Sequence, residues 1–288
     1  MKQYHIAILT ILCLLICPSS SCIKAALRLS SSTFSNLTSS IFEECDPELA
    51  ESSIPANLKI LEGLLKNDPN NKIILTSLSM GFCGYSMLFV EAEDPERASD
   101  LYLRAREYGM KALGPIGISL MDLKSKDINN VLANVGEKEL SSLFWTTISW
   151  QLWINLSLDN PAALSQLERS ESCLERILEI DAGYLYGLPY ILKGVTLSAR
   201  PEMLGGNMEQ AKEYFEKALE LADRNFFPAH YYFARYYTVQ VQDKELFKEL
   251  IKEIAVGDPK VLEDVCLINT MFQHHAKKLY ENIEEFFF

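Results

Sequence analysis

Apolar side chains recur at helical spacing in this chain, and the segment from Met203 to Leu221 has the clearest pattern. Its apolar positions fall at i, i+4, i+7 and i+8, which lie on one face of an α-helix. No segment alternates convincingly between apolar and polar residues, which would indicate a half-buried strand. The pattern therefore predicts an all-α fold without a sheet. The residues on the apolar face are Ala211, Phe215, Ala218 and Leu219.

The order of small and large residues on this face is specific. Phe215 stands between Ala211 and Ala218, so a second helix can lie close beside the ring. This order is typical of the second helix of a tetratricopeptide (TPR) hairpin. Asn207 is a suitable N-cap, and Gln210 follows three residues later, where a capping box needs it. We therefore predict a TPR-like array of helical hairpins, an α-solenoid.

A similar block occurs earlier in the chain, at a constant offset of 113 residues without any gap. Each block has a helix, an Asp turn, a helix with a central Gly, a capped turn and a TPR-like helix. The offset predicts an internal duplication, with related blocks at about 54–113 and 167–226. The matched pairs include Asp68 and Asp181, Gly81 and Gly194, Ala98 and Ala211, Tyr102 and Phe215, and Ala105 and Ala218.

Cap residues and prolines divide the rest of the chain. Asp46-Pro47 predicts a short helix reaching Ser53, and Pro55 is expected to open the next one. A helix is expected from Glu139 to Leu156. The final helix is expected to begin at Asp258-Pro259 and to close the array.

The N-terminus has the pattern of an export signal. An apolar run from Ile6 to Cys17 is too short to span a membrane but fits the core of a signal peptide. Small residues precede Cys22, as in a bacterial lipobox, although Ser19 stands where Leu is usual. We predict a signal peptide at 1–21 and lipidation of Cys22; a secretory signal cut among the serines is the alternative. Residues 22–45 would then form a tether and first helix, and 46–288 the helical domain.

Charge and cysteine content narrow the function further. The formal net charge is −12, which repels phosphate backbones and argues against nucleic acid as a partner. Cys45, Cys83, Cys173 and Cys266 are widely spaced, without a CxxC pair, so a metal site is not expected. An exported protein could pair two of them. We favour buried free thiols, because a helical core of this size needs no cross-link.

The sequence has no catalytic motif. Adjacent His274 and His275 cannot jointly bind a metal as histidines at i and i+4 would, and His230 stands alone. No serine lies in a Gly-x-Ser-x-Gly motif. The Ser-x-x-Lys spacing from Ser21 to Lys24 spans the predicted cleavage point before Cys22, so it does not indicate a catalytic pair. We therefore predict neither an enzyme nor a cofactor or metal site.

Aromatic residues are the main candidates for a binding site. The predicted 139–156 helix carries three tryptophans, of which Trp150 and Trp153 share a face, and Asn155 follows. One interpretation is an apolar groove with a polar end. The other is core packing, in which large rings fill the space between helices. The candidate ligand-binding residues are Trp145, Trp150, Trp153, Asn155, Tyr231 and Tyr232.

Five short phrases of the chain are distinctive: Phe82–Tyr85, Asp94–Ala98, Ser149–Ser157, Arg200–Asn207 and Gln242–Phe247. Together they resemble the TatT family, the TPR-like T components of tripartite ATP-independent periplasmic (TRAP) transporters. The resemblance implies a periplasmic, lipid-anchored helical protein that binds the transporter's substrate-binding P component. It also implies a cavity or pore for a small hydrophobic ligand and self-assembly into a small ring, a homo-oligomer. It brings no catalytic residues.

The sequence thus favours a non-enzymatic periplasmic lipoprotein that serves a TRAP-type transporter. An envelope TPR scaffold that only docks other proteins is the alternative, and an enzyme with an all-helical pocket comes third. Neighbouring genes for a substrate-binding protein and a TRAP permease would separate the first two.

Overall fold

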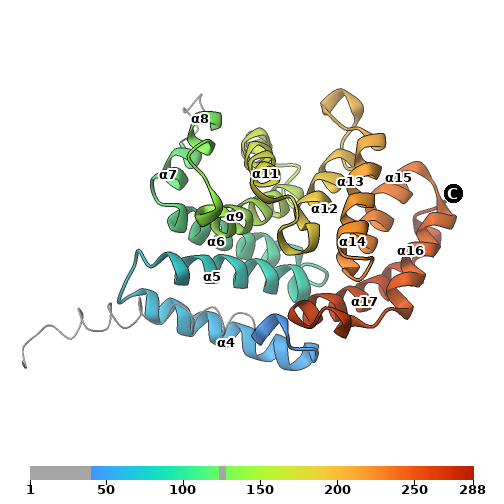
Figure 1. Ribbon diagram of the computed structural model, residues 1–288, viewed down its shortest axis with the longest axis horizontal. Helices are drawn as coiled ribbons and strands as arrows, with labels where there is room; N and C mark the ends of the chain where they lie inside the picture. The colour runs from blue at the N-terminus through green and yellow to red at the C-terminus, as the bar shows by residue number, and fades with distance from the viewer. Residues whose placement is uncertain (1–39, 123–127) are drawn as a thin grey trace, which may run out of the picture.

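The computed structural model describes residues 40–122 and 128–288 (Figure 1). These residues form helices and no strands, so the predicted all-α class is confirmed. The predicted signal peptide, residues 1–21, and the predicted lipidation site Cys22 lie outside the described residues. Of the predicted tether and first helix, residues 22–45, the described part is 40–45.

Three long helices open the described chain, and a side chain caps the start of each. The caps are Asp46, Asn71 and Asp94, whose side chains accept hydrogen bonds from backbone N–H groups of the first turn. The helices are α4 (Pro47–Leu65), α5 (Lys72–Tyr85) and α6 (Pro95–Leu113).

Helix α4 passes through Pro55 without a break, which corrects the prediction of a short helix ending near Ser53 and a new helix opening at Pro55. A proline deprives the carbonyl four residues earlier, that of Glu51, of its helical partner. Glu51 is exposed, so water can satisfy that carbonyl. On the other face, Ala50, Ile54 and Leu58 are buried and hold both halves of the helix on the core.

Helix α5 continues directly into a π-helical turn, η1 (Ser86–Val90). By length and composition alone, Lys72–Val90 is long and apolar enough to cross a membrane. Most of it is buried inside the fold, where α5 packs against α4, α6 and α9. This is the packing of a core helix.

Helix α9 (Glu137–Asn155) lies at the centre of the fold, against α5, α6 and α11 (Leu167–Asp181). The chain reaches it from α6 through two short helices, α7 (Pro115–Met121) and α8 (Ile128–Leu132). Three of its buried hydroxyls are satisfied locally, because each donates to the carbonyl four residues earlier. These hydroxyls belong to Thr146, Thr147 and Ser149.

The second half of the fold begins after α9. A short helix, α10 (Pro161–Leu164), leads to α11, α12 (Tyr184–Ser198), the 3-10 turn η2 (Glu202–Leu204) and α13 (Met208–Leu221). Asn207 caps α13 as predicted, because its side chain accepts from the Gln210 N–H at 3.0 Å. The reciprocal half of the capping box is replaced, since the Asn207 N–H donates to the Leu197 carbonyl oxygen.

Helices α6 and α13 begin 113 residues apart, at the predicted offset, and Ala98 and Ala211 are both fully buried in them. The paired glycines meet different neighbours. A Cβ at Gly81 would lie 2.5 Å from Leu58 of α4, whereas one at Gly194 would lie 2.9 Å from the Phe215 ring of α13. The internal duplication stays a prediction.

The C-terminal part begins with α14 (Phe227–Tyr232), which continues into a second π-helical turn, η3 (Phe233–Thr238), and α15 (Val239–Val241). The prediction that the final helix starts at Asp258-Pro259 is wrong. Asp258 caps a 3-10 turn instead, and the extended backbone of Leu262 (φ −110°, ψ 84°) interrupts the chain. The remaining elements are α16 (Lys244–Val256), η4 (Pro259–Val261), η5 (Glu263–Val265), α17 (Cys266–Glu281) and η6 (Ile283–Glu285).

A disulfide joins Cys45 to Cys266, whose Cα atoms are 5.2 Å apart. This corrects the expectation of free thiols for these two cysteines, whereas Cys83 and Cys173 are free and buried as predicted. The pairing follows from the path of α17, which returns along the molecule and contacts α4 (Figure 1). The disulfide thereby links the segment just before α4 to the first residue of α17.

Candidate functional site

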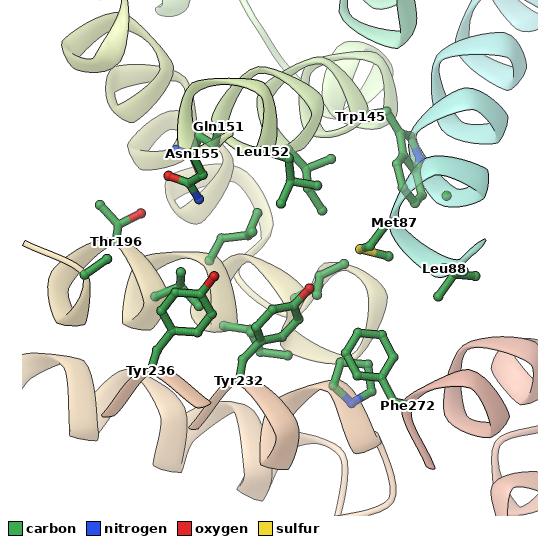
Figure 2. A pocket seen from close by; sticks show the side chains of 18 of the residues that line it. Met87, Leu88, Trp145, Gln151, Leu152, Asn155, Thr196, Tyr232, Tyr236 and Phe272 are labelled. Carbon is green, nitrogen blue, oxygen red and sulfur yellow. The ribbon is translucent and has the colours of Figure 1, made fainter. Parts of the chain in front are cut away.

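An apolar cavity of about 410 Å³ lies between α9 on one side and α12, α14 and α17 on the other (Figure 2). Its volume is in the range of small-molecule sites. The lining includes Trp145, Ile148, Gln151, Leu152 and Asn155 from α9, and Leu188, Ile191, Leu192, Val195 and Thr196 from α12. Other parts of the chain contribute Phe42, Met87, Leu88, Arg200, Phe226, Tyr232, Tyr236, Ile268 and Phe272.

One face of α9 forms a wall of this cavity. Trp145, Ile148, Leu152 and Asn155 follow one another at three or four residues, so they lie on one stripe of the helix. In Figure 2, Leu152 and Asn155 point into the cavity, and Trp145 stands at the end beside Met87. The stripe therefore runs from an aromatic end to an amide end.

Both π-helical turns deliver side chains to the cavity. η1 carries Met87 and Leu88, and η3 carries Tyr236, one turn after Tyr232. A π-turn inserts an extra residue and so changes the direction of the side chains around it, and such turns are frequent at functional sites. The sequence pattern gave no sign of either turn.

The hydroxyls of Tyr232 and Tyr236 point into the cavity from the side opposite α9 (Figure 2). Burial raises the pKa of both phenols, and the negative charge of Glu91 adds to the effect. Both tyrosines therefore stay neutral near neutral pH and offer hydrogen-bonding groups within an apolar wall.

Polar groups gather at one end of the cavity. Asn155 and Thr196 lie at the same end in Figure 2, and Arg200 follows Thr196 by four residues, just beyond α12. The Arg200 guanidinium forms an ion pair with Glu171. Burial lowers the pKa of Arg200, although arginine stays charged in proteins.

Three of the six predicted ligand-binding residues line this cavity, namely Trp145, Asn155 and Tyr232. Trp150, Trp153 and Tyr231 do not.

Trp150 and Trp153 share a face of α9, as predicted, but that face packs on the core. Trp150 is fully buried, and its Nε1 donates to Gln166 Oε1 at 3.0 Å. The guanidinium carbon of Arg106 lies 5.5 Å from the Trp150 ring centre and 4.9 Å from that of Trp153. Both rings thus make cation–π contacts with a buried arginine. Core packing, rather than ligand binding, explains their position.

Tyr231 lines a second cavity, of about 330 Å³, that contains more charged groups. Burial raises the pKa of its Glu91 carboxyl, which accepts a hydrogen bond from Tyr102. Burial lowers the pKa of its His275. The two cavities share Met87, Tyr232, Tyr236 and Phe272 as lining residues.

Sequence reasoning missed the wall opposite α9. Helix α12 carries Leu188, Ile191, Leu192 and Val195 at helical spacing, a visible signal that fits ordinary core packing equally well. Phe272 reaches the cavity only because α17 turns back across the molecule. No local pattern predicts that contact.

The first cavity is not lined by His230, His274 or His275. His230 is fully buried, and its Nε2 lies 2.9 Å from Glu253, which also pairs with Arg224. Burial lowers the pKa of His230. Within residues 40–122 and 128–288, no three His, Cys, Asp or Glu side chains are grouped to hold a metal ion.

The sequence model of a protein family described as TRAP transporter T-component matches residues 43–287. This span contains every helix from α4 to α17. It also contains all the lining residues of the two cavities except Phe42. This chain belongs to the TRAP transporter T-component family. The resemblance to TatT is thereby confirmed, and the family is one of periplasmic transporter-associated proteins rather than of enzymes.

This T-component is similar to a protein of Treponema pallidum (strain Nichols) that is described as an uncharacterized protein. The two sequences are 22% identical over 263 residues, which covers 85% of this chain and 81% of the relative.

Proposed function

We propose that this T-component holds a small hydrophobic ligand in the cavity beside α9 and binds the substrate-binding P component of a TRAP-type transporter. The observation that carries the proposal is the apolar cavity of about 410 Å³ in a member of this family. An apolar ligand gains free energy there by leaving water.

The size of the cavity supports a binding role over a packing defect. Protein interiors are close-packed, and voids larger than a water molecule are few. An empty apolar space of this volume forfeits van der Waals contacts along its whole wall, and a bound ligand would restore them. Trp145, Leu152 and Tyr232 would contact that ligand.

Partner docking rests on the helical architecture. We take the helices as TPR-like hairpins of an α-solenoid, with related blocks at 54–113 and 167–226. Matching caps and buried alanines at the constant offset support this. Such arrays present extended surfaces to protein partners, here the P component and, in a homo-oligomeric ring, further copies of the chain.

The proposed location is the periplasm, with the chain held at the membrane by a lipid on Cys22 after removal of residues 1–21. The Cys45–Cys266 disulfide supports an oxidising compartment. In this proposal the chain is not an enzyme and does not bind nucleic acid.

The alternative function, an envelope TPR scaffold that only docks other proteins, predicts partner binding without a ligand. The cavity favours the ligand-binding function, because docking of another protein does not require an apolar cavity inside the fold.

A cavity-filling variant tests the proposal. Decanol serves as a small hydrophobic probe. Leu152 points into the cavity, so Leu152→Trp should abolish decanol binding in a calorimetric titration. The same variant should still sediment with the P component as wild type does. Leu49→Trp is the matched control, because Leu49 is 54% exposed on α4 and lines no cavity described above. Circular dichroism checks the fold of both variants.

Three outcomes separate the possibilities. Loss of decanol binding in Leu152→Trp alone supports the proposal. Normal decanol binding by Leu152→Trp would mean that the cavity is not the site. Docking of the P component by a wild type that binds no decanol would favour the scaffold function.

A further inference from the structure

We infer that the ligand is an amphiphile with a carboxylate head, the chemistry of a fatty acid, whose head contacts Arg200 and whose tail lies along α9 toward Trp145. This inference rests on the proposed function, since it specifies the ligand of the same cavity.

Arg200 carries the only charge among the residues that line the described cavity. A charged group at an apolar wall loses hydration and therefore needs a partner. That partner is Glu171, which does not line the cavity. The pair thus presents its cation to the cavity and keeps its carboxylate behind.

The polar groups around Arg200 are free to bind a carboxylate. The ion pair with Glu171 involves Nη2, and a guanidinium is a planar fork with several further N–H donors. The side chains of Asn155 and Thr196 have no hydrogen-bond partner within the part of the chain that the structure describes, and both lie at this end of the cavity (Figure 2). A carboxylate accepts hydrogen bonds at both oxygens, so it matches this set of donors.

The opposite end of the cavity is formed by large, mainly apolar side chains and contains no charged group. Trp145, Met87 and Phe272 lie there in Figure 2, and Leu152 lies between the two ends. A ligand that satisfies both ends therefore has one charged head and an apolar tail. The tyrosine hydroxyls on the facing wall remain neutral and do not oppose an anion.

The second cavity is a poorer site for the head, although it also contains cations. Its Glu91 carboxyl repels an anion when ionised, and its Lys278 pairs with Glu93 at 3.1 Å. Its Arg235 guanidinium lies 4.7 Å from the Phe286 ring centre. The Glu91 carboxyl opposes a carboxylate head in the second cavity, whereas the lining of the first cavity contains Arg200 and no carboxylate, so the head is assigned to Arg200.

The test compares three probes with the same tail: decanoate, decanol and decyltrimethylammonium, each titrated calorimetrically into the full chain. Wild type should bind decanoate about tenfold more tightly than decanol, because a hydrogen-bonded charged head adds that much. Decyltrimethylammonium should bind most weakly.

Variants of the ion pair locate the head. Arg200→Gln combined with Glu171→Gln leaves no buried unpaired charge, and it should abolish the preference for decanoate while decanol still binds. Glu171→Gln alone should increase the preference, because it removes the competing carboxylate. Arg235→Gln is the control in the second cavity and should behave as wild type.

The outcomes also distinguish the inference from the proposed function. Equal binding of decanoate and decanol by wild type would overturn the carboxylate head and leave the apolar site intact. A preference lost in Arg235→Gln and kept in the Arg200 double variant would place the head in the second cavity and overturn the assignment. If none of the probes binds, the ligand-binding function itself fails.

Discussion

The two faces of α9 carry tryptophan into different surroundings. On one face, Trp145 borders the cavity together with Leu152 and Asn155. On the other, Trp150 and Trp153 close over the Arg106 guanidinium. Exposure does not separate the two faces, since Trp145 is 2% exposed and Trp150 is 0% exposed. The faces differ in what the tryptophan ring meets: the ring of Trp145 borders the cavity, whereas the rings of Trp150 and Trp153 pack on Arg106.

On α9, residue type alone therefore does not distinguish the binding face from the core face. The two faces differ in which side chains pack against them. On the core face, Gln166 Oε1 accepts hydrogen bonds from both Trp150 Nε1 and Arg106 Nη1. The cavity face leaves the amide of Asn155 without an internal partner among the described residues. Trp150 should accordingly contribute to stability and Trp145 to ligand binding.

The largest expected effect is on the core face. Trp150→Ala should lower the free energy of unfolding by about 3–5 kcal/mol, because it leaves a cavity and uncovers the buried Arg106. Denaturant unfolding followed by circular dichroism measures this. Trp150→Phe is the milder control, since it keeps most of the packing. A Trp150→Ala variant as stable as wild type would remove the distinction between the faces.

A smaller effect is expected where α6 crosses the core face. A Cβ at Gly109 would lie 2.0 Å from Thr146 Oγ1, so Gly109→Ala must push α6 away from α9. We expect a loss of about 1–3 kcal/mol in thermal or denaturant unfolding. Gly63→Ala on α4 has no atom within 4 Å of the new methyl group and should instead stabilise the helix by about 0.5–1 kcal/mol. Equal shifts in the two variants would show that the crossing is not tight.

The free thiols next to α9 give the smallest signal. Burial raises the pKa of Cys83 and of Cys173 to about 12, and hydrogen bonds with Ser149 and Thr147 offset it only in part. Both thiols should therefore resist iodoacetamide at pH about 8 in the native protein and react in denaturant, as peptide mass spectrometry would show. Rapid native labelling of either one would mean that its side of α9 opens readily.

Local features of the fold were predictable from the sequence. The caps at Asp94 and Asn207, the helix around the tryptophans and the buried alanines follow from side-chain chemistry within one turn or from helical spacing. The Cys45–Cys266 pair was not predictable, because 221 residues separate the two cysteines and only the return of α17 brings them together.

The candidate site was also predictable only in part, because some of its residues follow a local helical pattern and others are brought in by tertiary packing. Trp145 and Asn155 lie on a helix that the sequence identifies, but periodicity does not tell which face meets empty space. Phe272 comes from α17, and Tyr236 is directed by a π-turn, so both depend on tertiary packing. The residues on α9 could therefore be predicted from local spacing, whereas those that other elements contribute could not.

The most direct test is tryptophan emission during a decanol titration of wild type, Trp145→Phe and Trp153→Phe. Since Trp145 lines the cavity and Trp153 does not, the emission change should vanish in Trp145→Phe and persist in Trp153→Phe. Decanol binding, measured separately by calorimetry, should remain detectable in both variants. An emission change that survives in Trp145→Phe and disappears in Trp153→Phe would contradict the assignment of the cavity as the ligand site.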